Sequence, residues 1–216
     1  MSLTFPVVAI ASDASDTQPV VELLSVWSGK SAAALVIVQS LQGQRPKPRD
    51  SVMADLGEFS VVQAHDGVEL EAAHAYLAPP DSNLSFAGER ICVTPRPRGG
   101  GPELPGDALM RSLAEVHSTN GVGVVLSGAG TDGAQGLRAI RERGGVTFVQ
   151  YPGSARIPSM PINAIETGCV DFVLRPNEIA HRLVGLLARA RDAEKAYGAA
   201  PRVGGARTAA DNPGPP

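Results

Sequence analysis

The chain has 216 residues, of which 43% are hydrophobic and 19% are charged, and its formal net charge is −3. This length and composition fit a folded domain with a sizeable core and argue against wholesale disorder. The acidic balance and the 4% aromatic content disfavour nucleic acid as a partner, because phosphate binding needs a basic face and base stacking needs aromatic rings.

The two cysteines are too few for a disulfide scaffold or a zinc cluster, and they suggest a reducing compartment. No segment approaches the run of about 18 apolar residues that a membrane span needs. The start of the chain also lacks a basic run followed by a long apolar stretch. We therefore expect a cytoplasmic protein without membrane insertion.

Short apolar runs without polar alternation recur along the chain, as is typical of parallel strands covered on both faces. They lie at Phe5–Ile10, Ala33–Val38, Gly121–Leu126, Val146–Val149 and Val170–Leu174. Helical patterns separate or follow these runs, at Pro19–Ser28, Asp107–His117, Gly133–Arg143 and Pro176–Arg191. The alternation predicts an α/β fold with a doubly wound, mostly parallel sheet flanked by helices.

The middle of the chain predicts a small antiparallel β insertion at about residues 58–93. Its expected strands lie at Glu58–Val62, Val68–Leu77 and Leu84–Val93, with turns at Asp66–Gly67 and Pro79–Asp81. A loop rich in Gly and Pro is expected at Pro95–Pro105. The folded domain is predicted at residues 5–192, and residues 193–216 are predicted to be disordered because Gly, Ala and Pro dominate the end of the chain.

Ligands of open parallel sheets bind at the carboxyl ends of the strands, and a glycine-rich segment is predicted to lie there. The segment Gly128-Ala129-Gly130-Thr131-Asp132-Gly133 matches G-x-G-x-x-G between a strand and a helix. A dinucleotide-binding fold is disfavoured, since the next strand ends in Gln150 rather than in an acid. The glycines can still direct backbone N–H groups toward an anion or a developing oxyanion.

Asp132 has two interpretations at this stage. It stands where a helix N-cap belongs, and Gln135 three residues later completes a pattern like a capping box. Spacing alone favours that capping role over a catalytic one. Position alone also gives no catalytic role to the loop serines Ser12, Ser15 and Ser40, and the four histidines lack the spacing of a metal site.

Three segments, taken together, resemble one family, the catalytic domain of the chemotaxis receptor methylesterases (CheB). They are Val124–Gly136 (VVLSGAGTDGAQG), Met160–Gly168 (MPINAIETG) and His74–Asp81 (HAYLAPPD). Their order and spacing extend over residues 5–190. The resemblance implies a serine hydrolase fold that acts on methylated receptor glutamates, without the receiver domain that usually precedes it.

The resemblance also implies a triad of serine, histidine and aspartate. The matching positions hold Asp13 in place of the serine, Ser40 in place of the histidine, and Asp132, which is retained. The residues that match the oxyanion turn are Gly128, Ala129, Gly130 and Gly133, with Ala129 where the family has a methionine. If Asp13 and Asp132 lie close together, each is expected to raise the pKa of the other.

The leading hypothesis is a catalytically degenerate domain without cofactor or metal. It would bind a chemoreceptor cytoplasmic region or chemosensory signalling proteins, among them a separate receiver protein. A second hypothesis is an active hydrolase that uses Ser12 or Ser15, with His65 as base. A third is a site formed by Asp13, Asp16 and Asp132 for a divalent cation or a cationic side chain; the alternative is that these aspartates act as caps and turn formers.

Overall fold

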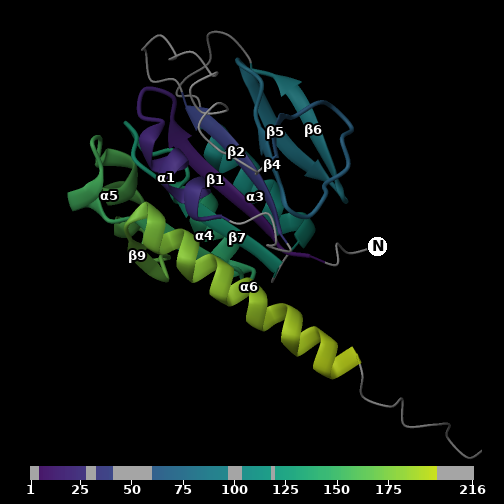
Figure 1. Cartoon of the computed structure of the whole chain (residues 1–216). Helices are drawn as coiled ribbons and strands as arrows, with labels where there is room; N and C mark the ends of the chain where they lie inside the picture. The colour runs from purple at the N-terminus through teal and green to yellow at the C-terminus, as the bar shows by residue number, and fades with distance from the viewer. Residues whose placement is uncertain (1–4, 28–32, 41–59, 97–103, 118–119, 199–216) are drawn as a thin grey trace, which may run out of the picture.

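A computed structural model describes residues 5–27, 33–40, 60–96, 104–117 and 120–198, with only the backbone described over residues 190–198. Its main sheet has seven strands in the order β3-β4-β2-β1-β7-β8-β9 (Figure 1). These strands are β1 (Val7–Asp13), β2 (Ala34–Ser40), β3 (Ser60–Gln63), β4 (His74–Leu77), β7 (Gly121–Val125), β8 (Val146–Gln150) and β9 (Phe172–Leu174). All neighbouring strands are parallel.

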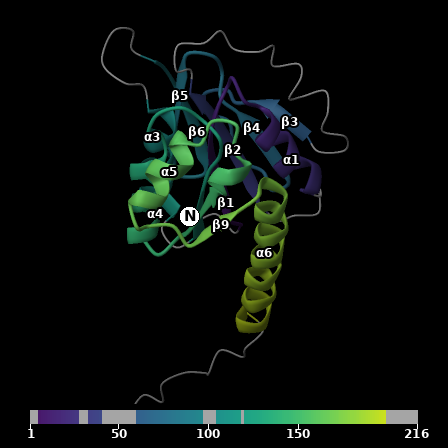
Figure 2. The same ribbon diagram turned by 90° about the vertical axis from the view of Figure 1, so that its left-hand side faces the viewer.

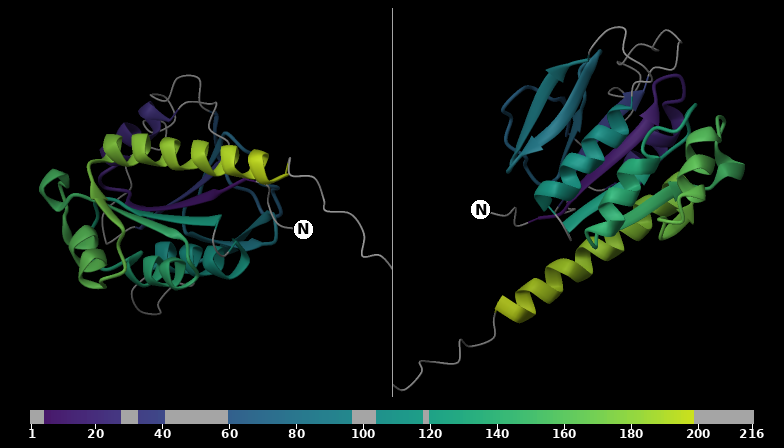
Figure 3. Two further views of the ribbon diagram at one scale, coloured as in Figure 1. Left: turned by 90° about the horizontal axis from the view of Figure 1, so that it is seen from below. Right: turned by 180° about the vertical axis from the view of Figure 1, so that it is seen from behind.

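Helices cover both faces of this sheet, which confirms the predicted fold class (Figure 3). Side chains alternate along β1, so Val8 and Ile10 face one core and Val7, Ala9 and Ala11 face the other. The first core contains α1 (Gln18–Val26) and α6 (Pro176–Gly198), and the second contains α3 (Pro105–His117), α4 (Ala134–Glu142) and α5 (Ser159–Glu166). Figure 2 shows α6 extending beyond the sheet.

The antiparallel part of the fold is smaller than the sequence pattern predicts. A hairpin of β5 (Ser82–Ala87) and β6 (Arg90–Pro95) is antiparallel, whereas β3 and β4 join the parallel sheet. The predicted antiparallel pairing of Glu58–Val62 and Val68–Leu77 is therefore wrong. The Asp66–Gly67 turn lies instead in the β3–β4 connection, where the Gly67 N–H donates to the Ile91 carbonyl at 2.8 Å.

Two helical elements were not predicted, the short 3₁₀ helix η2 (Pro152–Ser154) and α5. Helix α6 also continues to Gly198, beyond its predicted end at Arg191. Residues 199–216 of the predicted tail and residues 97–103 of the predicted Gly- and Pro-rich loop lie outside the described residues. Among the described residues, no helix is long and apolar enough to cross a membrane.

The strand order changes direction between β1 and β7, because the chain builds β2, β4 and β3 on one side of β1 and β7, β8 and β9 on the other. In doubly wound sheets the connections diverge at such a point and leave a crevice at the carboxyl ends of the two strands. The end of β1 and the glycine turn after β7 meet there.

Candidate functional site

Asp13 is the last residue of β1, and its carboxylate binds to the protein's own backbone. Its Oδ1 accepts a hydrogen bond from the Ser15 N–H at 2.8 Å, and its Oδ2 accepts one from the Ala129 N–H at 3.2 Å. The residue is only 3% exposed. Hydrogen bonds from backbone N–H groups to a carboxylate are shorter and stronger than those between neutral groups. The Asp13 side chain thus links the end of β1 to the glycine turn through a hydrogen bond.

Two N–H groups of that turn, those of Gly128 and Ala129, are used inside the protein. The Gly128 N–H donates to the Ile157 carbonyl at 2.9 Å, and the Gly128 carbonyl accepts from the Met160 N–H at 2.9 Å. The Ala129 N–H is held by Asp13. Gly128 has no room for a side chain, because a Cβ there would contact Met160 Sδ and lie 3.0 Å from Asp13 Cβ. The turn is therefore packed tightly against the end of β1.

The same turn is fixed further along by left-handed glycines. Gly130 and Gly133 have φ angles of 84° and 86°, which glycine adopts without strain. The Gly130 carbonyl accepts a hydrogen bond from Asn163 Nδ2 at 3.0 Å. Asn163 belongs to α5 and to the MPINAIETG segment. Two of the segments that carry the family resemblance thus meet in space.

Ser40 lies directly opposite Asp13 in the β1–β2 register. Its hydroxyl donates to the Ser12 carbonyl at 3.3 Å and lies 3.9 Å from Met160 Sδ. The residue is 1% exposed. The position that the resemblance assigned to a histidine is therefore filled by a small buried hydroxyl without a basic nitrogen.

Asp132 caps a helix, but not the helix that follows it. Its Oδ2 accepts from the Gly106 N–H and its Oδ1 from the Asp107 N–H, both at 3.0 Å, at the start of α3. The predicted capping box with Gln135 is wrong, since the N-cap of α4 is Gly133 and carries no side-chain cap. In return, Asp107 accepts from the α4 Gly136 N–H at 2.8 Å. The two aspartates join α3 to α4 reciprocally.

Burial dominates the electrostatics of this pair. Asp132 is fully buried, and desolvation raises its pKa from 3.8 to about 6, against the effect of the N–H groups that it accepts. The neighbouring carboxylate that adds to this rise in pKa is Asp107, not Asp13 as the resemblance suggested. Burial also raises the pKa of Asp107. Both oxygens of Asp132 already accept hydrogen bonds from α3.

The two alternative nucleophiles differ in exposure. Ser12 is fully buried, and its Oγ has no hydrogen-bond partner in the described part of the chain. Because side chains alternate along a strand, it points to the face opposite Asp13. Ser15 is half-buried, and its carbonyl accepts from the Arg156 guanidinium. His65 is exposed and follows β3. Strands β4 and β2 lie between β3 and β1, so β3 is roughly 14 Å from β1.

Asp16 forms a separate network. Its Oδ2 accepts from Ser127 Oγ at 2.6 Å, and its Oδ1 lies 3.4 Å from Arg156 Nε. Gln150 Oε1 accepts from the Ser127 N–H at 2.8 Å. The third hypothesis allowed a metal cation or a cationic side chain at these aspartates. Of the three aspartates, only Asp16 forms an ion pair with a cationic side chain in the described part of the chain, that of Arg156. Asp13, Asp16 and Asp132 bind different partners, and no group of three His, Cys, Asp or Glu among the described residues could hold a metal.

Sequence reasoning did not identify Asp107 or Arg156 as residues of this region, and it gave no role to Ser127, which lies within the Val124–Gly136 segment. Asp107 carried one usable signal, an acid in the first turn of a predicted helix. Ser127 and Arg156 carried none, because their partners come from distant parts of the chain.

A parallel sheet with helices on both faces and a glycine turn at its switch point defines a doubly wound α/β domain. The family model described as CheB methylesterase matches residues 8–183, so the chain belongs to the CheB methylesterase family. The resemblance seen in the sequence is confirmed.

Two relatives carry names of this family. A protein-glutamate methylesterase/protein-glutamine glutaminase from Pyrococcus abyssi is 30% identical over 181 residues, which are 82% of this chain and 49% of the relative. A putative enzyme of the same name from Leptospira interrogans is 28% identical over 187 residues, which are 85% of this chain and 96% of the relative. The chain thus spans about half the length of the first relative.

The fold matches that of a solved structure. The Thermotoga maritima CheB methylesterase catalytic domain superposes with a TM-score of 0.74 and 23% sequence identity, covering 85% of this chain and 100% of the solved one. This match supports the fold of the chain.

Proposed function

We propose that this domain binds a partner in a chemosensory pathway and does not hydrolyse esters. The observation that carries the proposal is the Asp13 carboxylate, buried at the matching nucleophile position and bound to the Ala129 N–H. A negative charge there opposes the negative charge that develops on an ester oxygen during attack. The amide that could stabilise that oxygen is already occupied.

The positions of the histidines support the same conclusion. The sequence holds four histidines, and the structure describes all of them. His65 follows an outer strand, and His74 opens β4 at the opposite edge of the sheet. His117 packs edge-on against Phe86 at the end of α3, and His181 is exposed on α6. None of the four reaches Ser12 or Ser15 to act as a general base.

The proposed partner is the cytoplasmic region of a chemoreceptor or a chemosensory signalling protein, including a separate receiver protein. Family membership supports this class of partner. The relatives are named for action on protein glutamate. A domain that keeps their scaffold without the triad is suited to recognition of a similar surface.

The test measures hydrolysis and binding side by side. Purified protein is incubated with a methylated chemoreceptor fragment, methanol release is followed, and binding of the fragment is measured by calorimetry. We expect binding without methanol above the buffer blank, while an active CheB catalytic domain as positive control releases methanol. Release that disappears in Ser12→Ala or Ser15→Ala, but persists in the exposed control Ser25→Ala, would replace this proposal with the rearranged hydrolase.

A further inference from the structure

A cavity of about 430 Å³ lies where the start of α6 meets α1, and it is called the α1–α6 cavity below. Glu22 lines it from α1, Arg175 and Asn177 line it from the junction of β9 and α6, and Ser154 lines it from η2. Figures 1 and 2 show the start of α6 beside α1, and the two helices are in contact. The volume falls in the range of about 300–1,000 Å³ that is usual for small-molecule sites.

The α1 side of this cavity carries a negative charge. The Glu22 carboxylate forms no ion pair with any residue that the structure describes. Its Oε1 accepts a hydrogen bond from Gln18 Nε2 at 3.4 Å. Because this donor is neutral and the contact is long, the carboxylate can still accept strong hydrogen bonds from a cationic group.

The α6 side of the cavity carries a positive charge and a further donor. The Arg175 guanidinium has no ion pair or hydrogen bond among the described residues. The backbone of Arg175 is held in place, since its N–H donates to Glu178 Oε2 at 2.8 Å and Pro176 follows it. Asn177 Oδ1 accepts from the Glu178 N–H at 3.0 Å, so its Nδ2 is the end of the amide that can donate to a ligand.

The third side of the cavity is already satisfied. Ser154 Oγ donates to the Tyr151 carbonyl at 2.8 Å and accepts from Gln150 Nε2 at 3.3 Å. The charged groups available to a ligand are therefore Glu22 on one side and Arg175 on the other.

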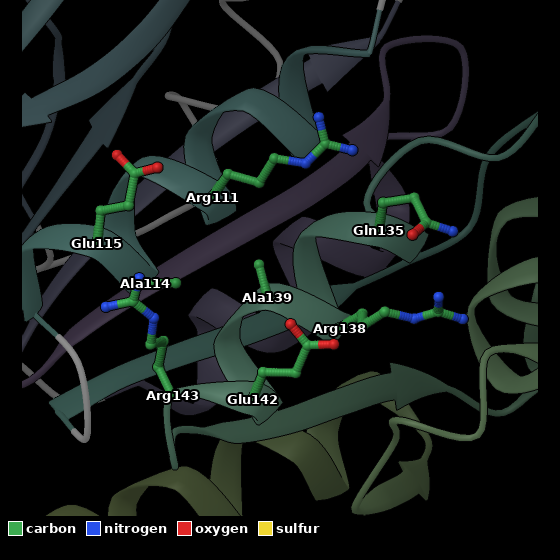
Figure 4. A pocket seen from close by; sticks show the side chains of 8 residues that line it. All are labelled: Arg111, Ala114, Glu115, Gln135, Arg138, Ala139, Glu142 and Arg143. Atoms are coloured by element: carbon green, nitrogen blue, oxygen red, sulfur yellow. The ribbon is translucent and has the colours of Figure 1, made fainter.

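The groove over α3 and α4 lacks this separation of charge. Figure 4 shows the Arg143 guanidinium beside Ala114, between Glu115 and Glu142. Positive and negative groups are mixed there, so that groove does not select one orientation of a charged ligand.

We propose that the α1–α6 cavity binds a free α-amino acid. In the complex, the ammonium group of the ligand faces Glu22, and its carboxylate faces Arg175 and Asn177 Nδ2. Each charge of the ligand then meets the opposite charge, whereas a purely anionic or purely cationic ligand brings a like charge to one side or leaves it unpaired. This cavity is separate from the strand-end site, so the inference does not rest on the function proposed for that site.

The probes are L-alanine and two fragments of it: ethylamine, which lacks the carboxylate, and propionate, which lacks the ammonium group. Each is titrated into the full chain, and backbone amide NMR shifts report both affinity and location. We expect L-alanine to bind in about the millimolar range and to shift the amides of Glu22 and Asn177. It should bind about tenfold more tightly than either fragment, because each fragment loses one charged contact.

The decisive variants are Glu22→Gln and Arg175→Gln, each of which removes one charge from the cavity. We expect each to weaken L-alanine binding about tenfold, and Arg175→Gln to remove the preference for L-alanine over ethylamine. The matched controls are Glu115→Gln on α3 and Arg189→Gln on α6, which make the same charge changes at exposed positions outside the cavity. The controls should leave binding unchanged, and thermal melts establish that all four variants are folded.

Three results would each overturn the proposal. They are no binding of L-alanine at about 10 mM, binding of ethylamine or propionate that is as tight as that of L-alanine, and equal affinity of L-alanine for the wild type and for the Glu22→Gln and Arg175→Gln variants.

Discussion

Substitution of Asp132 by asparagine tests how burial and capping balance at the start of α3. In the native protein the Asp132 carboxylate accepts from the Gly106 and Asp107 N–H groups at 3.0 Å. Asparagine keeps one acceptor oxygen, removes the negative charge and resembles the protonated acid. The comparison of wild type and Asp132→Asn therefore isolates the free energy of ionising Asp132 in the folded state.

The sign of the effect follows from the raised pKa. Burial raises the pKa of Asp132 from 3.8 to about 6, so the native state binds this proton more tightly than the unfolded chain does. This stabilisation is fully present below about pH 4 and is lost as the pH rises through about 6. The shift corresponds to about 3 kcal/mol in the free energy of unfolding.

The assay is urea unfolding of both proteins at several pH values between 4 and 7. We expect the stability of the wild type to fall by about 3 kcal/mol relative to Asp132→Asn over this range, or by roughly 6–12 °C in Tm. At pH 7, Asp132→Asn lacks the buried charge but also lacks one of the two acceptor oxygens, so its stability should lie within about 2 kcal/mol of the wild type. Asp132→Ala should be less stable than both, because two buried N–H groups lose their acceptor.

The control is Asp66→Asn. Asp66 is exposed, and its Oδ1 accepts from the Val93 N–H at 2.9 Å, so it has a comparable backbone contact without the burial. The reasoning is refuted if wild type and Asp132→Asn show parallel pH profiles, or if the wild type gains stability relative to the variant as the pH rises.

Further substitutions test the packing of the strand ends through thermal melts. Ser12→Ala should leave Tm unchanged or raise it, because the buried Oγ has no partner among the described residues; a loss of several degrees would contradict its assignment as an unpaired group. Gly128→Ala should cost about 1–3 kcal/mol through overlap with Met160, and a neutral result would show that the turn is loosely packed. Asp13→Ala should cost about 2–4 kcal/mol, since two N–H groups lose their acceptor, and added formate should raise the Tm of this variant but not of the wild type. An equal response of both proteins to formate would speak against an anion site at Asp13.

The parallel core of the fold could be predicted because its signals are local. Unbroken apolar runs mark β1, β2, β7 and β8, and helical spacing marks the helices that cover them. The pairing of β3 and β4 could not be predicted, because the direction of a short strand depends on its neighbour in the sheet. Helix α5 was missed because Pro161 interrupts a pattern of only eight residues, although proline is tolerated in a first helical turn.

The candidate site shows the same division between local and non-local information. Matching of motifs predicted that Asp13, Ser40 and the glycine turn lie at the ends of neighbouring strands, and the structure describes them there. The partner atoms of Asp132 and Asp16 depend on the placement of α3 and of the loop around Arg156. No spacing rule along the chain contains that information.

If two triad positions are changed as we propose, the contacts at the strand ends explain how the scaffold remains intact. A buried polar group must be satisfied by some partner, and an opened active site leaves several backbone groups for the substrate to satisfy. Here Asp13 satisfies the Ala129 N–H and Ser40 donates to the Ser12 carbonyl, so side chains of the chain itself satisfy these backbone groups. The contacts that hold the strand ends together therefore come from within the chain.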